Sequence, residues 1–426
     1  MLRKNIIFIF LAAAFLGVGL SYGKIYAFHL VFIISLFFFP YKKATDFFSN
    51  KPSFVFVFPA FMFLFYCLSS FWAPNLFFSI QYIGYLFFGM SIIYFPFFYV
   101  EKKEQLKKII IVLGAFLLLE LLVCLLEMYS SFRYPISPYS KLVSYFGHGY
   151  KIDPNLSASI KSSILTVPTG FHWNPNNLAA LLSTALPFTL LSNNKWIKYF
   201  GTFLLLIVLG ATNSRAVMFS VLLMVIYLVL MEFRITKKIL LGLFCLGFVF
   251  ILIPQNYNPF NSINRRITDS IEAVIGIVED NKQNTNSLGV RQELIKNALD
   301  ELDENLWLGI GAGNSKFIQQ KKGMVAGKVT SLHNFWLEIM VDVGLPFFLI
   351  FMSWYFRLAY KLILIADNNK NVQLIYLSKS TCIAMLVLLV SAISCSSIIY
   401  FLPFWILISI ALLLVKLSKK KDSLAT

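Results

Sequence analysis

Three nitrogen-bearing side chains in the second half of the chain have the types and positions for chemistry on an anionic substrate. His333 lies in Thr330-Ser331-Leu332-His333-Asn334, where a polar segment ends and a long apolar segment begins. An imidazole at such a boundary is connected to solvent but partly desolvated, which suits proton transfer near neutral pH. Arg215 and Arg291 lie at similar boundaries, and arginine binds phosphate bidentately without losing its charge. We therefore expect His333 to exchange protons and the arginines to bind an anion.

Each of these residues also has a structural interpretation. His333 can be an interfacial residue at the start of a helix, and Arg291 can be a solvated surface charge. Arg215 follows Asn213-Ser214 in a tight turn between two apolar segments, where it either snorkels to the interface or has an anionic partner. Arg291 begins a helical pattern at the end where the macrodipole favours acidic residues. The sequence leaves both interpretations open.

Membrane helices must position these residues. The 426 residues are 58% hydrophobic, with 45 Phe, and only 13% are charged. A soluble protein could not bury that much apolar surface. We predict an all-α polytopic membrane protein with about twelve transmembrane helices. The expected spans are residues 5–20, 25–40, 54–72, 76–99, 109–128, 177–192, 196–212, 215–232, 238–254, 335–363, 379–394 and 397–416.

The distribution of basic residues predicts the orientation. The net charge is +17, and most Lys and Arg fall in short loops on one side, whereas the short loops on the other side hold only Lys24 and Arg215. Because cytoplasmic loops collect basic residues, we expect both termini in the cytoplasm and the protein in the bacterial cytoplasmic membrane. The charge then reflects topology and not a nucleic-acid partner. All five Cys lie in apolar segments, which indicates neither a disulfide framework nor a metal cluster.

This orientation divides the chain into four parts. Residues 1–254 carry the first nine spans and an outer loop at 129–176, residues 255–332 form a large outer loop, residues 333–416 carry the last three spans, and residues 417–426 form a basic cytoplasmic tail. In the large loop, two sets of apolar residues recur at helical spacing and predict two amphipathic helices over the membrane domain. They are Ile263, Ile267, Ile271, Val274, Ile275 and Val278, and Leu294, Ile295, Ala298, Leu299, Leu302 and Leu306.

A glycine run follows the second amphipathic helix. Gly309, Gly311 and Gly313 have the composition of a phosphate cradle but lack the preceding strand of a dinucleotide-binding fingerprint. A helix stop and turn is the interpretation that the pattern favours.

The order and spacing of these motifs resemble the O-antigen ligase and O-antigen polymerase superfamily of bacterial membrane glycosyltransferases. The matching features are Gly170 with Asn174-Pro175-Asn176, Ser214-Arg215, Arg291, Gly309-Gly311-Gly313, His333-Asn334 and Gly344. The resemblance implies a lipid-dependent glycosyltransferase fold that transfers a glycan from a polyprenyl diphosphate to a sugar hydroxyl on the outer face of the membrane, without a metal or other cofactor. It places Arg215 and Arg291 on the diphosphate and His333 near the acceptor hydroxyl.

Further polar residues are candidates for substrate binding. Asn174, Asn176 and Asn334 belong to the matching motifs. Glu338 and Asp342 share one face of the helix after His333, and Glu338 either orients His333, binds sugar hydroxyls or forms a buried polar pair that positions helices. Glu120 and Glu127 are weaker candidates, and His172-Trp173 offers a stacking surface for sugar.

Three function classes follow from these observations. The first is a glycosyltransferase, with a polyprenyl-diphosphate-linked glycan as donor and a glycan or glycolipid as acceptor, acting as ligase or polymerase among membrane lipids. The second is a polysaccharide-lipid transporter or flippase, which typically carries charged residues deep within its helices. The third is a non-catalytic scaffold, which gives no reason for Arg215, Arg291 and His333. The clustering of the interesting charges at one face favours the transferase.

Overall fold

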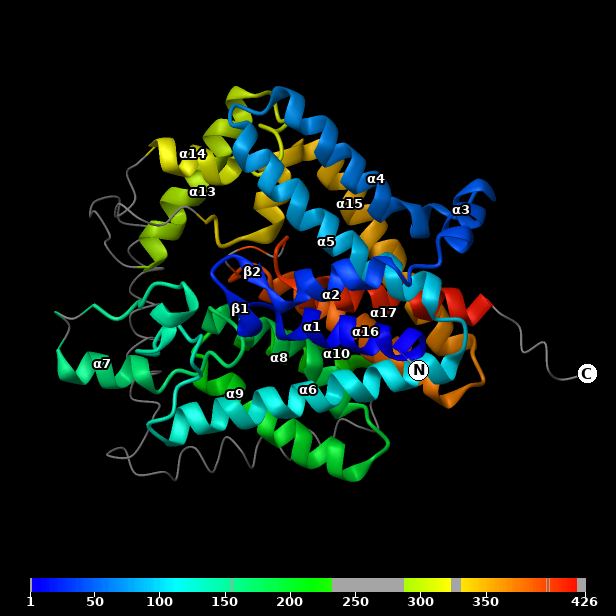
Figure 1. Ribbon diagram of the computed structural model, residues 1–426, viewed down its shortest axis with the longest axis horizontal. Helices are drawn as coiled ribbons and strands as arrows, with labels where there is room; N and C mark the ends of the chain where they lie inside the picture. Colours follow the sequence, from blue (N-terminus) through cyan, green and yellow to red (C-terminus); the bar gives the residue numbers. More distant parts are fainter. Residues whose placement is uncertain are drawn as a thin grey trace, which may run out of the picture.

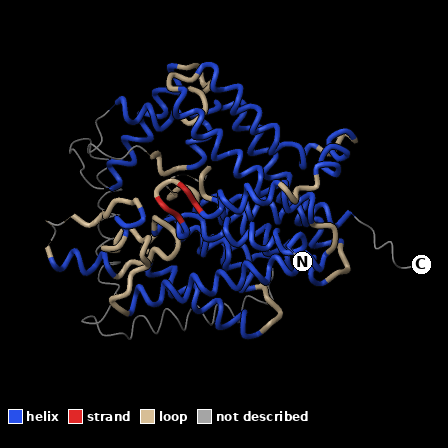
Figure 2. The backbone as a smooth tube through the Cα atoms, viewed as in Figure 1, coloured by secondary structure: helices blue, strands red, loops and turns tan. Residues whose placement is uncertain are grey.

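A computed structural model describes residues 2–153, 155, 157–231, 287–322, 331–395, 397 and 399–419. Helices dominate the described chain, with one short β-hairpin (Figure 2). Inside a membrane each backbone N–H and C=O needs a partner within its own segment, so long apolar segments become helices. The elements are α1 (Leu2–Leu16), β1 (Ser21–Tyr22), β2 (Ile25–Tyr26), α2 (Ala27–Leu36), α3 (Tyr41–Ser49), α4 (Phe54–Ser69), α5 (Leu76–Tyr99), α6 (Lys103–Tyr129), α7 (Ala158–Leu165), α8 (Pro175–Leu190), α9 (Thr202–Ala211), α10 (Arg215–Met231), α13 (Ser287–Glu304), α14 (Asn314–Lys322), α15 (Phe335–Asn368), α16 (Val372–Ser391) and α17 (Leu402–Lys419).

Helices α16 and α17 form the centre of the bundle. Helix α16 packs against α8, α10, α15 and α17, and helix α17 packs against α1, α5 and α15. Almost every residue of α17 is buried, although this segment is as apolar as helices that face lipid. Helices α4 and α5 lie beside α15, and α13 and α14 cover its beginning (Figure 1).

The prediction of a polytopic helical membrane protein agrees with this architecture, whereas the number of twelve spans is not confirmed. Among the described residues, six helices are long and apolar enough to cross a membrane. A seventh span results if α2 and α3, which meet at 78°, count as one broken span. Three shorter apolar helices cover 5–20, 197–211 and 215–229. The expected span 238–254 and the first amphipathic helix lie outside the described residues.

The bend between α2 and α3 is a feature that the expected span 25–40 does not include. Pro40 is the N-cap of α3 and cannot continue the hydrogen-bond ladder of α2. Helix α3 that follows is short and carries Lys42, Lys43 and Asp46 beside Phe47, and none of its residues is buried. Such an amphipathic helix suits the membrane interface better than the hydrocarbon core.

Helix α15 is broken inside the membrane domain, close to the candidate site. Gly344 has φ 84° and ψ 160°, and Pro346 has no N–H, so the carbonyls of Val341 and Asp342 lose their helical donors. Residues 307–311 supply the missing partners. Ile310 N donates to Val341 O, Gly311 N donates to Asp342 O, and Leu345 N donates to Trp307 O, each at 2.9 Å.

The glycine run is required by this close approach. Gly309, Gly311 and Gly313 all have positive φ, and a Cβ on Gly309 would lie 2.3 Å from the backbone nitrogen of Gly344. Each backbone N–H from residue 310 to residue 313 donates within the protein. The N–H groups of residues 310–313 are therefore not available to a phosphate, and the run forms the turn that the sequence favours.

Candidate functional site

His333 lies immediately before the N-cap of α15, in the left-handed region with φ 49°. Its ring hydrogen-bonds to the backbone of Ser394, and its Nδ1 is buried without a partner among the described residues. Burial, followed by repulsion from Arg291, lowers the pKa of His333 to about 4, and Lys151 contributes in the same direction. The imidazole is therefore neutral at physiological pH.

Arg291 lies within electrostatic reach of both Arg215 and His333. Arg215 is the first residue of α10 and is exposed, whereas Arg291 is half-buried near the start of α13. Desolvation lowers the pKa of Arg291, and the charge of Arg215 adds to this effect, so the two guanidinium groups are within electrostatic reach. The two cations repel each other, and each is also repelled by the positive end of its own helix dipole. An anion bound between them would stabilise this arrangement.

Lys151 is a third cation of the site that the sequence did not indicate. It comes from the outer loop 129–176, and its charge acts on His333. Its Nζ lies 5.2 Å from the centre of the Trp173 ring, which also contacts His148 at 4.9 Å. His148 Nε2 in turn lies 2.9 Å from Ser21 Oγ at the start of the β-hairpin. A lone Lys in a loop of mixed composition carries no motif, so only the fold reveals its place.

The burial of the His172 ring removes it from the predicted stacking surface at His172-Trp173. The His172 ring is buried against Phe401 at 5.6 Å between ring centres, and burial lowers its pKa to about 4. It therefore presents no exposed face. Trp173 is half-buried beside Lys151 and is the member of the pair that remains accessible.

The connection between α16 and α17 contacts three of the motif residues, Asn176, Ser214 and His333. Ser394 Oγ lies 3.4 Å from Ser214 Oγ, its backbone meets the His333 ring, and Cys395 Sγ donates to the carbonyl of Asn176 at 3.9 Å. The sequence predicts spans at 379–394 and 397–416, which leaves only two residues for this turn. Helices α16 and α17 instead end at Ser391 and begin at Leu402. Ser394 and Ser397 of the segment form hydrogen bonds. The apolar pattern of the surrounding sequence does not indicate them.

Asn174 and Asn334 are helix N-caps. Asn174 Oδ1 accepts from Asn176 N at 2.9 Å, with Pro175 at the first position of α8, and Asn334 Oδ1 accepts from Leu337 N at 3.3 Å. These caps fix the ends of α8 and α15 that face the site. Contact of Asn174, Asn176 or Asn334 with substrate remains a prediction.

Glu338 and Asp342 are both buried, and each has hydrogen-bond partners of its own. Asp342 is fully buried, and its carboxylate accepts from Gly313 N at 2.9 Å and Ser315 N at 3.0 Å, capping the start of α14. Glu338 Oε1 accepts from the Tyr82 hydroxyl at 2.9 Å. The backbone of Ser394, and not Glu338, contacts the His333 ring. Glu338 as a sugar-binding residue stays a prediction.

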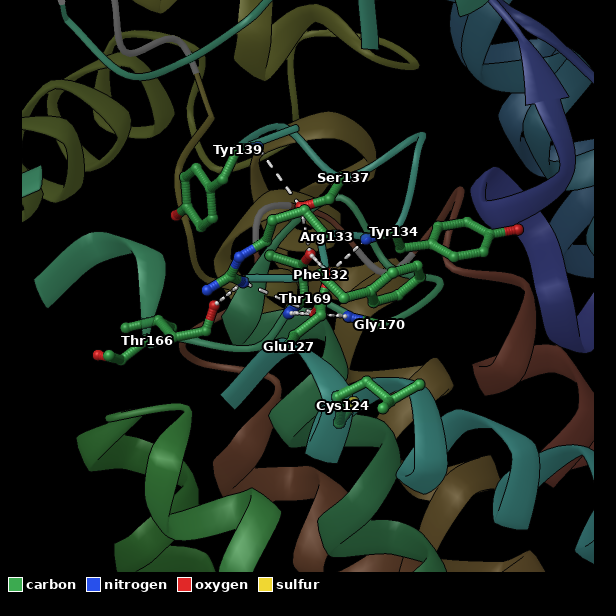
Figure 3. A network of polar contacts seen from close by, with 12 residues as sticks. Cys124, Glu127, Phe132, Arg133, Tyr134, Ser137, Tyr139, Thr166, Thr169 and Gly170 are labelled. Atoms are coloured by element: carbon green, nitrogen blue, oxygen red, sulfur yellow. Dashed lines mark hydrogen bonds and ion pairs between the residues drawn. The ribbon is translucent and has the colours of Figure 1, made fainter. Parts of the chain in front are cut away.

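Glu120 and Glu127 hold the outer loop to α6. Glu127 accepts from the backbone N–H groups of Thr169 at 2.7 Å and Gly170 at 2.9 Å, and Glu120 accepts from Phe171 N at 2.9 Å. Figure 3 shows the Glu127 part of this network beside the Arg133 side chain. A Cβ on Gly170 would lie 1.8 Å from Glu120 Oε1, which explains the glycine of the motif. These carboxylates therefore position the loop that leads into the Asn-Pro-Asn turn.

Comparisons with known proteins bear on the family that the chain resembles. The family model described as O-antigen ligase matches residues 200–352, which include Arg215, Arg291 and His333. The chain is also similar to the teichuronic acid biosynthesis protein TuaE of Bacillus subtilis (strain 168), at 24% identity over 388 residues that cover 86% of this chain and 72% of the relative. Among the described residues, no group of three or more His, Cys, Asp or Glu side chains is placed to hold a metal ion. The resemblance to the O-antigen ligase and polymerase superfamily, predicted from the order of the motifs, is confirmed by both comparisons.

Proposed function

We propose that this protein is a membrane glycosyltransferase of polysaccharide biosynthesis, which transfers a polyprenyl-diphosphate-linked glycan to a sugar hydroxyl. The observation that carries the proposal is the convergence of Arg215, Arg291 and Lys151 around a neutral His333. The family match, described as O-antigen ligase, and the relative, named for teichuronic acid biosynthesis, support the class of substrate. A lipid-linked donor also accords with a site built at the ends of membrane helices.

The cations bind the diphosphate of the donor. Arg215 and Arg291 supply planar guanidinium groups that match phosphate oxygens bidentately, and Lys151 supplies a point charge. Because Arg291 is half-buried, its attraction to the anion is screened less than that of a surface charge. The N-termini of α10 and α13 add positive potential at the same place. These charges stabilise the leaving group as its negative charge increases in the transition state.

His333 acts on the acceptor. The acceptor hydroxyl oxygen attacks the anomeric carbon of the donor glycan, and the bond from that carbon to the diphosphate oxygen breaks with its electron pair on the diphosphate. The hydroxyl proton goes to His333. The ring N–H that bonds to the Ser394 backbone leaves Nδ1 with its lone pair, so Nδ1 is the basic atom. The products are an extended glycan and free polyprenyl diphosphate.

The remaining polar residues contact sugar. Trp173 presents a half-exposed aromatic ring beside Lys151. Asn176 near the start of α8 and Glu338 on α15 are the other two residues that we propose to contact sugar. Asn174 and Asn334 act through the helix ends that they cap.

The site belongs to the outer face of the bacterial cytoplasmic membrane in this proposal, with both termini in the cytoplasm. The support is the asymmetry of Lys and Arg between the short loops. The division into membrane parts 1–254 and 333–416, a large outer loop at 255–332 and a tail at 417–426 follows from the same orientation.

A deletion strain tests the function and separates its two forms. Loss of a polymerase leaves surface glycans of a single repeat unit, whereas loss of a ligase leaves full-length chains on the lipid carrier. Accumulation of lipid-linked units facing the cytoplasm would instead identify a transporter or flippase. Surface glycans of normal length and attachment would contradict all three.

A further inference from the structure

A cavity of about 310 Å³ opens at the end of the bundle away from His333. Its lining combines three lysines and one glutamate with four phenylalanines: Lys43, Lys416, Lys419, Glu101, Phe47, Phe56, Phe97 and Phe98. These residues come from α3, α4, the end of α5 and the end of α17, segments far apart in the sequence. The cavity shares no residue with the site around His333.

The rim of the cavity is cationic. The Lys43 ammonium forms an ion pair with Glu101, the one carboxylate of the lining. Lys416 donates to the carbonyls of Phe97 and Val100 and so caps the C-terminus of α5. Lys419 lies at the mouth, and Arg357 and Lys361 of α15 are within electrostatic reach of the same region. The positive charges therefore exceed the carboxylate by a wide margin.

The floor of the cavity is aromatic. Phe47 from α3 contacts Phe97 at 5.2 Å and Phe98 at 5.5 Å between ring centres, and Phe56 contacts Phe97 at 5.2 Å. The ammonium groups of two lysines lie over these rings, Lys416 at 4.7 Å from the centre of Phe97 and Lys419 at 5.2 Å from the centre of Phe56.

The position of α3 defines where the cavity lies relative to a bilayer. Helix α3 projects beside the end of α17 (Figure 1), and it exposes Tyr41 and Phe48 while Phe47 points into the ring cluster. An amphipathic helix with Tyr and Lys residues is typical of the membrane interface. The cavity mouth thus faces lipid head groups, and its aromatic floor faces the beginning of the acyl chains.

We infer that this cavity binds the head group of an anionic phospholipid, with the phosphate against Lys43 and Lys419 and the first acyl carbons against the phenylalanine rings. The distribution of Lys and Arg assigns this end of the bundle to the cytoplasmic leaflet. Clusters of basic residues next to membrane helices attract anionic lipids, and each Lys near the surface adds to that attraction. The enclosed aromatic floor adds a requirement for acyl chains, which a free phosphate does not satisfy.

Lipid titration of the purified full-length protein in detergent tests this site. Native mass spectrometry or thermal unfolding should show saturable stabilisation by phosphatidylglycerol and little by phosphatidylcholine or inorganic phosphate. The double variant Lys43→Gln/Lys419→Gln should raise the half-saturating concentration of phosphatidylglycerol about tenfold or more. Glu101→Gln, which removes a carboxylate from the lining, should lower that concentration.

The matched control is Lys107→Gln/Lys108→Gln. These two lysines are exposed on α6 at the same end of the bundle but do not line the cavity. The control should keep the wild-type response, because only the total charge changes. An equal loss in the control would mean that general surface charge attracts the lipid, and an equal response to phosphatidylcholine or inorganic phosphate would mean that no phospholipid site exists. Either result overturns the inference.

Discussion

The surroundings of His333 lower its pKa and so favour the neutral imidazole. Burial removes water, and Arg291 and Lys151 repel the imidazolium, while only the Ser394 backbone favours it. The sequence alone leaves this histidine at its ordinary pKa of about 6.5, because charges from residues far along the chain are invisible there. In the proposed reaction, a bound diphosphate would reverse the local charge, so the donor itself would make Nδ1 more basic when a base is required.

This charge reversal predicts different pH dependence for kcat/KM and kcat. In the free enzyme the pKa of His333 is about 4, so kcat/KM should stay constant above about pH 5 and fall only below it. With donor bound, the nearby anion raises the pKa, so kcat should begin to fall at a higher pH than kcat/KM does. Rate measurements across pH on the purified protein check this order. A fall of kcat/KM centred near pH 6.5 would contradict the environment described for His333.

Arg215 and Arg291 provide a second prediction about single residues. Lysine keeps the charge but not the bidentate geometry, so Arg215→Lys and Arg291→Lys should each lose about tenfold or more in kcat/KM, or about 1.4 kcal/mol of transition-state stabilisation. Arg357→Lys, a conservative change away from the site, is the control and should keep full activity. Wild-type activity in Arg215→Lys or Arg291→Lys would reduce that arginine to a surface or snorkelling residue.

The helix ends and loops position these residues more than the helix interiors do. Apolar segment length predicted where helices form, and each expected span within the described residues overlaps a helix. It did not predict the bend at Pro40, the β-hairpin, or the long connection from 392 to 401, because their determinants are single residues and tertiary hydrogen bonds. For the site, motif order indicated Arg215, Arg291 and His333, whereas Lys151 and Ser394 became visible only when the fold brought distant loops together.

We expect the stability of the protein to be most sensitive to substitutions at the break in α15. Gly344 has positive φ, and a Cβ there would lie 2.5 Å from the backbone of Leu308. We expect Gly344→Ala and Gly309→Ala each to destabilise the protein by about 2 kcal/mol or more, seen as a lower Tm in detergent.

Gly84→Ala in α5 is the matched control. This glycine has no positive φ, a Cβ added to it would meet no atom within 4 Å, and alanine favours a helix. Its Tm should be equal to or above the wild-type value. A Tm for Gly344→Ala equal to that of Gly84→Ala would mean that the contact between the glycine run and α15 does not hold the fold.

At the scale of the whole molecule, the proposed orientation places the site on the outside. Tyr145 in the loop 129–176 and Asp300 on α13 are exposed, and so is Lys107 at the other end of the bundle. In a background without the native cysteines, Tyr145→Cys and Asp300→Cys should react with an impermeant thiol reagent in cells without an outer barrier, and Lys107→Cys only after lysis. The reverse pattern would invert the topology and place the site in the cytoplasm.

Reconstitution with defined substrates measures the proposed reaction directly. Purified full-length protein in lipid is given a polyprenyl-diphosphate-linked glycan and an acceptor glycan, and the longer glycan and free polyprenyl diphosphate are quantified together. We expect the wild type to form both in equal amounts, and His333→Ala to lose about 10²-fold to 10⁴-fold in rate while it still binds the donor through the cations. Equal rates for His333→Ala and the wild type, or near-normal turnover of His333→Gln, would contradict His333 as the general base. No coupled release of polyprenyl diphosphate by the wild type with either a repeat-unit or a glycolipid acceptor would contradict glycosyl transfer itself.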